Sequence, residues 1–166
     1  MKLRRVHQNL VSQPLPDVAA EVRSQLDALQ INVPQGDVAI TAGSRGISNI
    51  EMGMPIRASM DCVKIGSVAT GDVWMDRHAY ESAGVLVLNR IKLHTCCSGS
   101  IQSGLIKMMV VGMGKIRSAE TFHAAPTNKM RDMLLEMGPV ILNSGKVWAG
   151  LAILEDGFDQ TAELHA

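Results

Sequence analysis

Aromatic residues and an excess of charge of one sign are both lacking in this chain. Only 3% of its 166 residues are aromatic, and 16 Lys and Arg balance 16 Asp and Glu, so the formal net charge is zero. Nucleic-acid-binding domains usually carry an excess of Lys and Arg, and disordered chains contain fewer apolar residues than the 46% found here. The composition predicts an ordinary globular domain with no nucleic-acid partner, in which any attraction for an anion is local.

Long apolar runs and paired cysteines are lacking too. No run approaches the roughly 18 to 20 apolar residues that span a membrane, and the basic segment 1–16 is not followed by the apolar stretch of a signal peptide. The three cysteines include the adjacent Cys96 and Cys97, which could bridge each other only with strain. A disulfide framework is therefore not expected. We expect a soluble, cytoplasmic protein with no membrane partner.

Methionine, by contrast, is plentiful. The eleven methionines predict a core in which flexible thioethers fill irregular gaps. Short apolar runs predict strands over 37–42, 59–68, 71–75, 84–91 and 147–155. Helical patterns are found over 18–30 with Asp17 as N-cap, 76–83, 104–112, 119–125 with Ser118 as N-cap, 126–143, and a last short segment from Asp159.

Strands that alternate with helices and are continuously apolar are typical of an α/β sheet. We therefore expect a single domain over 1–166, with a parallel or mostly parallel sheet and helices on both faces, as in Rossmann-like folds. One step does not fit this pattern. The segment between strands 37–42 and 59–68 is too short for a parallel crossover, which needs a dozen or more residues.

Two glycine-containing loops have features of phosphate-binding sites. "GSRG" follows strand 37–42, where α/β proteins bind ligands. There Ser44 leaves room for an anion, and Arg45 could hold a phosphate or carboxylate in a bidentate fork. The alternative is an ordinary turn with a surface arginine. "GMGK" at 112–115 is not a nucleotide-binding P-loop, because Met109 and Ile116 stand where Gly and Ser or Thr are required.

His94 follows strand 84–91, and loops at that end of a strand often carry catalytic groups. Its imidazole could transfer a proton near neutral pH, or could simply bond to the backbone. With Cys96 and Cys97 it gives only three nearby ligands, too few for a closed zinc site.

Lys107 lies in the apolar stretch "GLIKMMVV". It either reaches out to water or is held in a desolvated pocket, where an amine becomes a nucleophile. Taken alone, His123 is typical of a surface histidine.

Several motifs together resemble one family. "GSRGISN", "GMPIRASMDCVKIG", "VWMDRHAYESAGVLVLNRIKLHT", "GLIKMMVVGMGKIRSAETFH" and "VWAGLAILEDGFDQTAEL" are similar, in order and along nearly the whole chain, to nickel-dependent lactate racemases. The resemblance implies an isomerase acting on a small-molecule 2-hydroxy acid. It also implies a pyridinium nucleotide that holds nickel through sulfur and carbon atoms and accepts the α-hydrogen as hydride.

The resemblance assigns roles to individual residues. Lys107 matches the lysine that carries the nickel-pincer nucleotide and takes part in catalysis, and His123 matches the nickel ligand. His94 matches one acid–base histidine. Ser44 and Arg45 fall in the loop that holds an anionic group.

The chain also departs from the family pattern. Several dozen residues, including a second acid–base histidine, are expected between Asn49 and Gly53, and the later C-terminal region is absent. Leu93 replaces a usual proline. We expect the sequence to represent part of a longer protein, and racemase activity only where the missing segments exist. Two alternatives stay open: a non-catalytic module that binds an anion or cofactor, and a structural remnant that needs a partner, such as a second copy, to complete its sheet.

Overall fold

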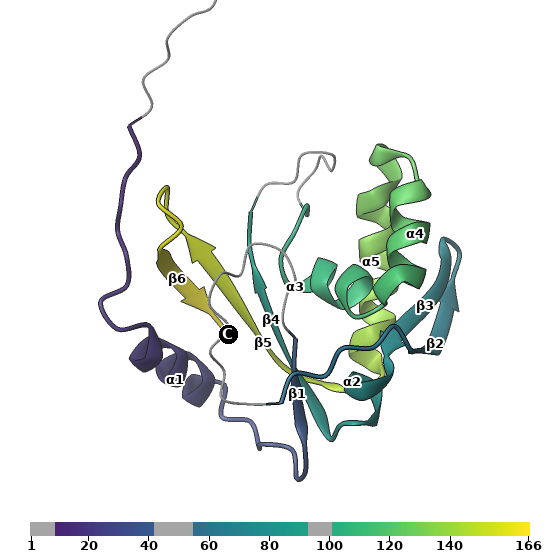
Figure 1. Cartoon of the computed structure of the whole chain (residues 1–166), viewed down its shortest axis with the longest axis horizontal. Coiled ribbons are helices and arrows are strands. Elements are labelled where there is room, and N and C mark those ends of the chain that lie inside the picture. Colours follow the sequence, from purple (N-terminus) through teal and green to yellow (C-terminus); the bar gives the residue numbers. More distant parts are fainter. Residues whose placement is uncertain (1–8, 42–54, 93–100) are drawn as a thin grey trace, which may run out of the picture.

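The computed structural model describes residues 9–41, 55–92 and 101–166 (Figure 1). The chain forms a main sheet of four strands in the order β1-β4-β5-β6. Strands β1, β4 and β5 are parallel, and β6 is antiparallel to β5. The bounds of these strands are β1 Val38–Ile40, β4 Gly84–Arg90, β5 Val147–Glu155 and β6 Thr161–His165. The predicted α/β fold with a mostly parallel sheet is confirmed.

The segment after Asp159 is a strand, so the helix predicted there is wrong. Asp159 has a φ of +59° and lies in a tight turn after β5. In that turn the Asp156 carboxylate accepts hydrogen bonds from the backbone N–H groups of Phe158 and Gln160, at 2.8 and 3.1 Å. The turn reverses the chain and places β6 beside β5.

Two further predicted strands pair with each other and not with the main sheet. Strands β2 (Cys62–Val68) and β3 (Gly71–Asp76) form a separate antiparallel hairpin. The parallel neighbour of β1 is therefore β4, and the connection between them includes this hairpin and helix α2 (Arg77–Glu81). The crossover after strand 37–42 looked too short only because strand 59–68 was expected to be the next strand of the main sheet.

The two predicted N-caps have different outcomes. Helix α1 (Val18–Ala28) has Asp17 as N-cap, as predicted, since its Oδ1 accepts the backbone N–H of Ala20 at 2.9 Å. Ser118 is not an N-cap. Helix α4 (Lys115–Ala124) begins before it, and the buried Ser118 donates its backbone N–H to Gly114.

The predicted helix over 104–112 is divided between two kinds of helix. It consists of α3 (Leu105–Lys107) and a π-helix, η1 (Met108–Gly112). The long helix α5 (Thr127–Asn143) continues through Pro139. The absent side chain of Gly138 lets α3 approach α5, because a Cβ there would lie 2.8 Å from two Ile106 carbons.

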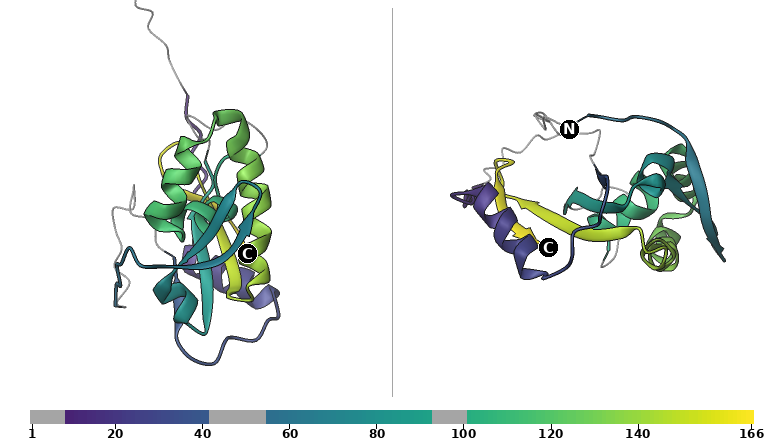
Figure 2. Two further views of the ribbon diagram at one scale, coloured as in Figure 1. Left: turned by 90° about the vertical axis from the view of Figure 1, so that its right-hand side faces the viewer. Right: turned by 90° about the horizontal axis from the view of Figure 1, so that it is seen from below.

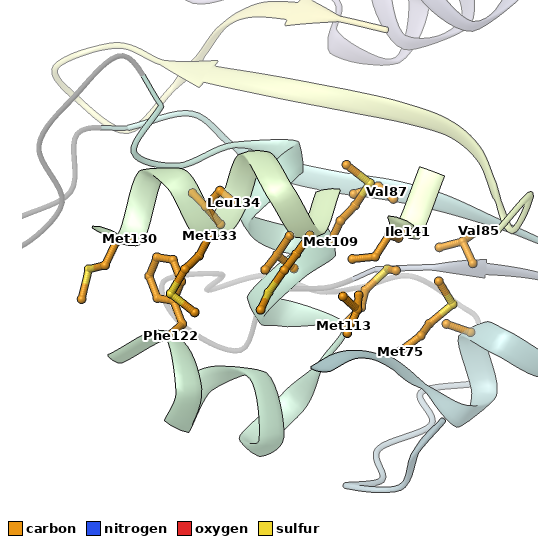
Figure 3. Close-up of a cluster of buried hydrophobic side chains, with 14 residues drawn as sticks. Met75, Val85, Val87, Met109, Met113, Phe122, Met130, Met133, Leu134 and Ile141 are labelled. Carbon is orange, nitrogen blue, oxygen red and sulfur yellow. The ribbon is translucent and has the colours of Figure 1, made fainter. Parts of the chain in front are cut away.

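The core is rich in methionine, as predicted. It lies between β4, the hairpin, η1, α4 and α5 (Figure 3). Six of its buried residues are methionines: Met75, Met109, Met113, Met130, Met133 and Met137. Helix α1 contacts β6 instead, at the opposite side of the molecule from α4 and the hairpin (Figure 2). None of the helices within the described residues is long and apolar enough to cross a membrane.

Candidate functional site

Strands β1, β4 and β5 end at the same edge of the main sheet, which we call the carboxyl edge. Two sets of side-chain contacts join the strand ends there. The Thr41 hydroxyl donates to the Leu88 carbonyl at 3.0 Å and accepts the Leu88 N–H at 2.8 Å. Arg90 Nη1 contacts both carboxylate oxygens of Glu155, at 3.0 and 2.8 Å. These contacts fix the three strand ends against one another, which makes the edge a rigid base for a site.

Three of the predicted site residues, Ser44, Arg45 and His94, lie outside the described residues, as do Cys96 and Cys97. Thr41 and Lys92 are the last described residues before them, and both lie at the carboxyl edge. The roles predicted for Ser44, Arg45 and His94 stay predictions.

The chain that enters α3 is attached to the end of β4. The Asn89 side-chain amide donates to the Gly104 carbonyl at 2.9 Å, and the Lys92 N–H donates to Ser103 Oγ at 2.8 Å. Gly104 has a φ of +85°, a conformation that residues with a side chain rarely adopt. This turn leads into α3, which packs against β4 and β5, and sets the position of its last residue, Lys107.

Lys107 is followed directly by the π-helix, in which Met113 donates its N–H to Met108 at 2.8 Å. Single π-helical turns are rare and occur often at functional sites. The Lys107 side chain is partly buried, and its Nζ lies 5.7 Å from the centre of the Phe122 ring. An ammonium at this distance from an aromatic face is attracted by it. The Lys107 side chain is thus not fully exposed to water, and its surroundings include an aromatic ring as well as aliphatic groups.

His123 lies in the last turn of α4 and is exposed. Its ring meets the Phe122 ring in an edge-to-face arrangement, with centroids 5.4 Å apart and an interplanar angle of 85°. His123 directly follows Phe122 in α4, so its contact with this ring is local, whereas the contact of Lys107 with the ring joins α3 to α4. The end of α4 is at the same end of the molecule as the carboxyl end of β4 (Figure 1). The fold therefore places the Lys107 ammonium near the residue that precedes His123.

Phe122 is a member of this site that the sequence interpretation missed. The residue is 1% exposed and belongs to the main core cluster. Its position directly before His123 was the only hint in the sequence that it belongs to the site. A lone phenylalanine in a helix, however, predicts only a contact with the core. Its relation to Lys107 depends on how α3 and α4 pack, which no local pattern encodes.

The lysine of "GMGK" has a structural partner. Lys115 Nζ lies 3.1 Å from Oδ2 of Asp76, which is 8% exposed and also caps α2 by accepting the Ala79 N–H at 2.9 Å. Burial, together with the Asp76 carboxylate, raises the pKa of the nearby Cys62 thiol. A thiol with a raised pKa is a poor nucleophile and a poor metal ligand at neutral pH. This group of residues stabilises the junction of β2, β3 and α4 and is not part of the candidate site.

Within the ranges that the structure describes, no three His, Cys, Asp or Glu side chains are grouped so that they could hold a metal ion. His123 can offer one imidazole. Comparison of the sequence with protein-family models and with curated proteins finds no match. The likeness to lactate racemases is therefore a prediction from motifs.

Proposed function

We propose that this chain belongs to a 2-hydroxy-acid racemase or epimerase in which Lys107 carries a nickel-pincer nucleotide and His123 ligates its nickel. One observation supports the proposal: the Lys107 Nζ lies 5.7 Å from the centre of the ring of Phe122, the residue directly before the exposed His123. Two groups that act on one bound molecule need to come from neighbouring parts of the fold, and the contact of Lys107 with α4 meets that need. The motif spacing alone does not require this contact.

The chemistry of the two side chains fits such a group. Lys107 is partly buried, while His123 is exposed and can reach a bound metal. Imidazole and sulfur ligands both suit nickel. A pincer nucleotide brings its own sulfur and carbon ligands, so one protein imidazole is sufficient. When bound, this group supplies the acceptor for the hydrogen on the substrate's α-carbon.

The remaining roles belong to residues of this chain. Arg45 and Ser44 bind an anionic group, either a phosphate of the nucleotide or the substrate carboxylate, because a guanidinium matches both in a bidentate fork. His94 takes the proton from the substrate hydroxyl and returns it, as an imidazole can near neutral pH. Three cysteines without a disulfide framework suit a reducing compartment, so the protein acts in the cytoplasm under this proposal.

The test is the mass of the purified chain after it is produced together with enzymes that make the nickel-pincer nucleotide. We expect a covalent mass increase on the peptide that contains Lys107, and nickel in the intact protein. Lys107→Arg is the matched variant, since it keeps the cation beside Phe122 but lacks the primary amine. It should show neither change. A bare wild-type polypeptide under the same conditions would overturn the proposal.

A further inference from the structure

We infer that the outer edge of β1 is an interface at which two copies of this chain pair, strand against strand. β1 is the outermost strand of the main sheet, and its sole strand partner within the described ranges is β4. An edge strand presents a row of unpaired backbone N–H and C=O groups, which is a template for another strand. The inference concerns assembly and does not depend on the proposed function.

The hydrogen bonds at the two ends of β1 show which of its backbone groups face outward. The carbonyl of Asp37 and the N–H of Thr41, which flank the strand, are both bonded on the β4 side, at 2.8 and 3.0 Å. Because the direction of the backbone groups alternates along a strand, Ala39 midway between them also faces β4. Val38 and Ile40 therefore direct their N–H and C=O groups away from the sheet. Within the described part of the chain, these outward groups have no hydrogen-bond partner.

β1 has none of the features that usually keep another strand away from a sheet edge. Such edges are commonly protected by Lys, by Pro or by a bulge. β1 consists of Val38, Ala39 and Ile40, and its register against β4 is unbroken. Ala39 packs against the core, so the two β-branched side chains lie on the opposite face, where both are partly exposed. The edge is therefore apolar and open to a further strand.

The edge fits a second copy because it is self-complementary. In an antiparallel pairing centred on Ala39, Val38 lies opposite Ile40 of the second copy and exchanges both backbone hydrogen bonds with it. Ile40 does the same with Val38 of the second copy, so every outward group of both edges is satisfied. Each pair joins two β-branched side chains, which is favourable across strands. Asp37 lies opposite Thr41, so no like charges meet, and a formal net charge of zero adds no repulsion between the copies.

The resulting dimer has a two-fold axis at Ala39 and an isologous interface. It joins two four-stranded sheets into one continuous sheet. Because β1 contributes three residues, the contact is smaller than the interfaces of permanent dimers. We therefore expect a reversible dimer that dissociates on dilution.

The first test uses the wild-type chain. Sedimentation equilibrium from micromolar to millimolar concentration, with a reducing agent to prevent disulfide bonding, should show the mean mass rising toward that of two chains. Amide hydrogen exchange at Val38 and Ile40 should slow by about ten-fold when about nine-tenths of the chains are paired, because exchange then occurs from the monomer. The amide of the exposed Val33 is the control and should not change.

Two results would overturn the inference. One is the mass of a single chain at millimolar concentration, which would leave the edge to a strand of another protein. The other is a dimer in which the amides of Val38 and Ile40 exchange as fast as in the monomer.

The second test addresses the register of the pairing. Val38→Lys with Ile40→Lys places lysines opposite lysines, and Val38→Glu with Ile40→Glu places glutamates opposite glutamates, so each double variant alone should be monomeric. Mixed in equal amounts, they should form a dimer with one chain of each kind, detected by native mass spectrometry.

The matched control is Ile31→Lys with Val33→Lys, which adds the same charge at exposed positions before β1 and should pair like the wild type. Double variants at Val38 and Ile40 that pair with themselves as well as the wild type does would overturn the inference. If a variant does not fold, the exchange measurement on the wild type still decides.

Discussion

The Lys107 ammonium lies 5.7 Å from the centre of the Phe122 ring, although a π-helix and most of α4 separate the two residues along the chain. The contact depends on the direction in which α3 leaves the sheet and on the point where α4 ends. Gly104, with a φ of +85°, sets the direction of α3, and the extended backbone of Ala125 ends α4. This long-range contact places the Lys107 amine near the last turn of α4, which carries His123.

The first prediction separates the role of His123 from that of Lys107. His123→Ala should keep the covalent mass increase on Lys107 but lose nickel, because the nickel would lack its protein ligand while the amine is unchanged. Since His123 is exposed, its loss should change the free energy of unfolding by less than about 0.5 kcal/mol. Nickel content by mass spectrometry and intact mass check both parts. His165→Ala, another exposed histidine, is the control.

If the nickel content of His123→Ala equals that of the wild type, His123 is not the ligand. If the adduct disappears as well, the two residues act as a unit, and the assignment of separate roles is wrong.

A second prediction concerns the two glycines of "GMGK". A Cβ on Gly114 would lie 1.8 Å from Ser118 Oγ and 2.9 Å from the Val110 carbonyl oxygen, whereas a Cβ on Gly112 would meet mainly the Met108 thioether, 2.3 Å from its sulfur. A long methionine side chain can move, but a short serine and a backbone carbonyl cannot. Gly114→Ala should therefore lower the free energy of unfolding by about 1 to 3 kcal/mol. Gly112→Ala should be near neutral.

Urea unfolding of the two variants, followed by circular dichroism, measures this difference directly. Equal stabilities would show that the close approach of α4 to η1 at Gly114 is not required for the fold.

Much of the fold could be predicted because its signals are local. The apolar runs of β4 and β5 and the capping Asp17 of α1 are each contained in a few consecutive residues. Strand β6 was missed for the opposite reason. Its sequence contains Ala, Glu and Leu, which favour helices in isolation, and its strand conformation comes from pairing with β5 after the Asp156 turn.

The hairpin and the candidate site also depend on contacts between distant parts of the chain, which local sequence patterns do not specify. Strands β2 and β3 were predicted as strands, but no local pattern states that they pair with each other outside the main sheet. Serine is a common N-cap residue, yet α4 begins before Ser118. The missing side chain of Gly114 lets the first turn of α4 pack closely against Ser118 and the Val110 carbonyl. Lys107 and His123 were assigned by resemblance to a family. The contact of Lys107 with Phe122 depends on tertiary packing and could not be predicted, whereas His123 contacts Phe122 as its neighbour in the chain.

A third prediction concerns the pH dependence of the contact between the N-terminal segment and the β5–β6 turn. Asp156 accepts hydrogen bonds from Ser12 Oγ at 2.9 Å and the Gln13 N–H at 3.2 Å, in addition to those from Phe158 and Gln160. Partial desolvation raises the pKa of Asp156, but these four hydrogen bonds outweigh it, so the pKa lies below its ordinary value.

A carboxyl group whose pKa is lower in the folded chain stabilises the fold above the unfolded pKa and loses that contribution as the pH falls through the folded value. We therefore expect Asp156→Asn to be less stable than the wild type at pH 7, with the difference shrinking as the pH falls from about 4, the unfolded pKa, through the lower pKa of the folded chain. Urea unfolding at pH 7 and pH 3 measures it. The control is Asp61→Asn, the same change at an exposed position. A stability difference that is as large at pH 3 as at pH 7 would contradict the role given to the carboxylate.

The last prediction concerns Lys115, which combines backbone strain with a partly buried ion pair. Its φ is +51°, a left-handed conformation that costs a residue with a side chain about 1 to 2 kcal/mol. Its Nζ lies 3.1 Å from the buried Asp76 carboxylate. The strain persists because the ion pair compensates a carboxylate that would otherwise be buried alone.

Three variants separate these two effects. Lys115→Met keeps the strain and removes the ion pair, so it should be the least stable. Lys115→Gly also removes the ion pair but relieves the strain, and should be more stable than Lys115→Met by about 1 kcal/mol. The double variant Lys115→Met with Asp76→Asn should recover part of the loss, because asparagine still caps α2 and leaves no unpaired charge. If Lys115→Met and Lys115→Gly unfold at the same urea concentration, the left-handed conformation at this position stores no strain.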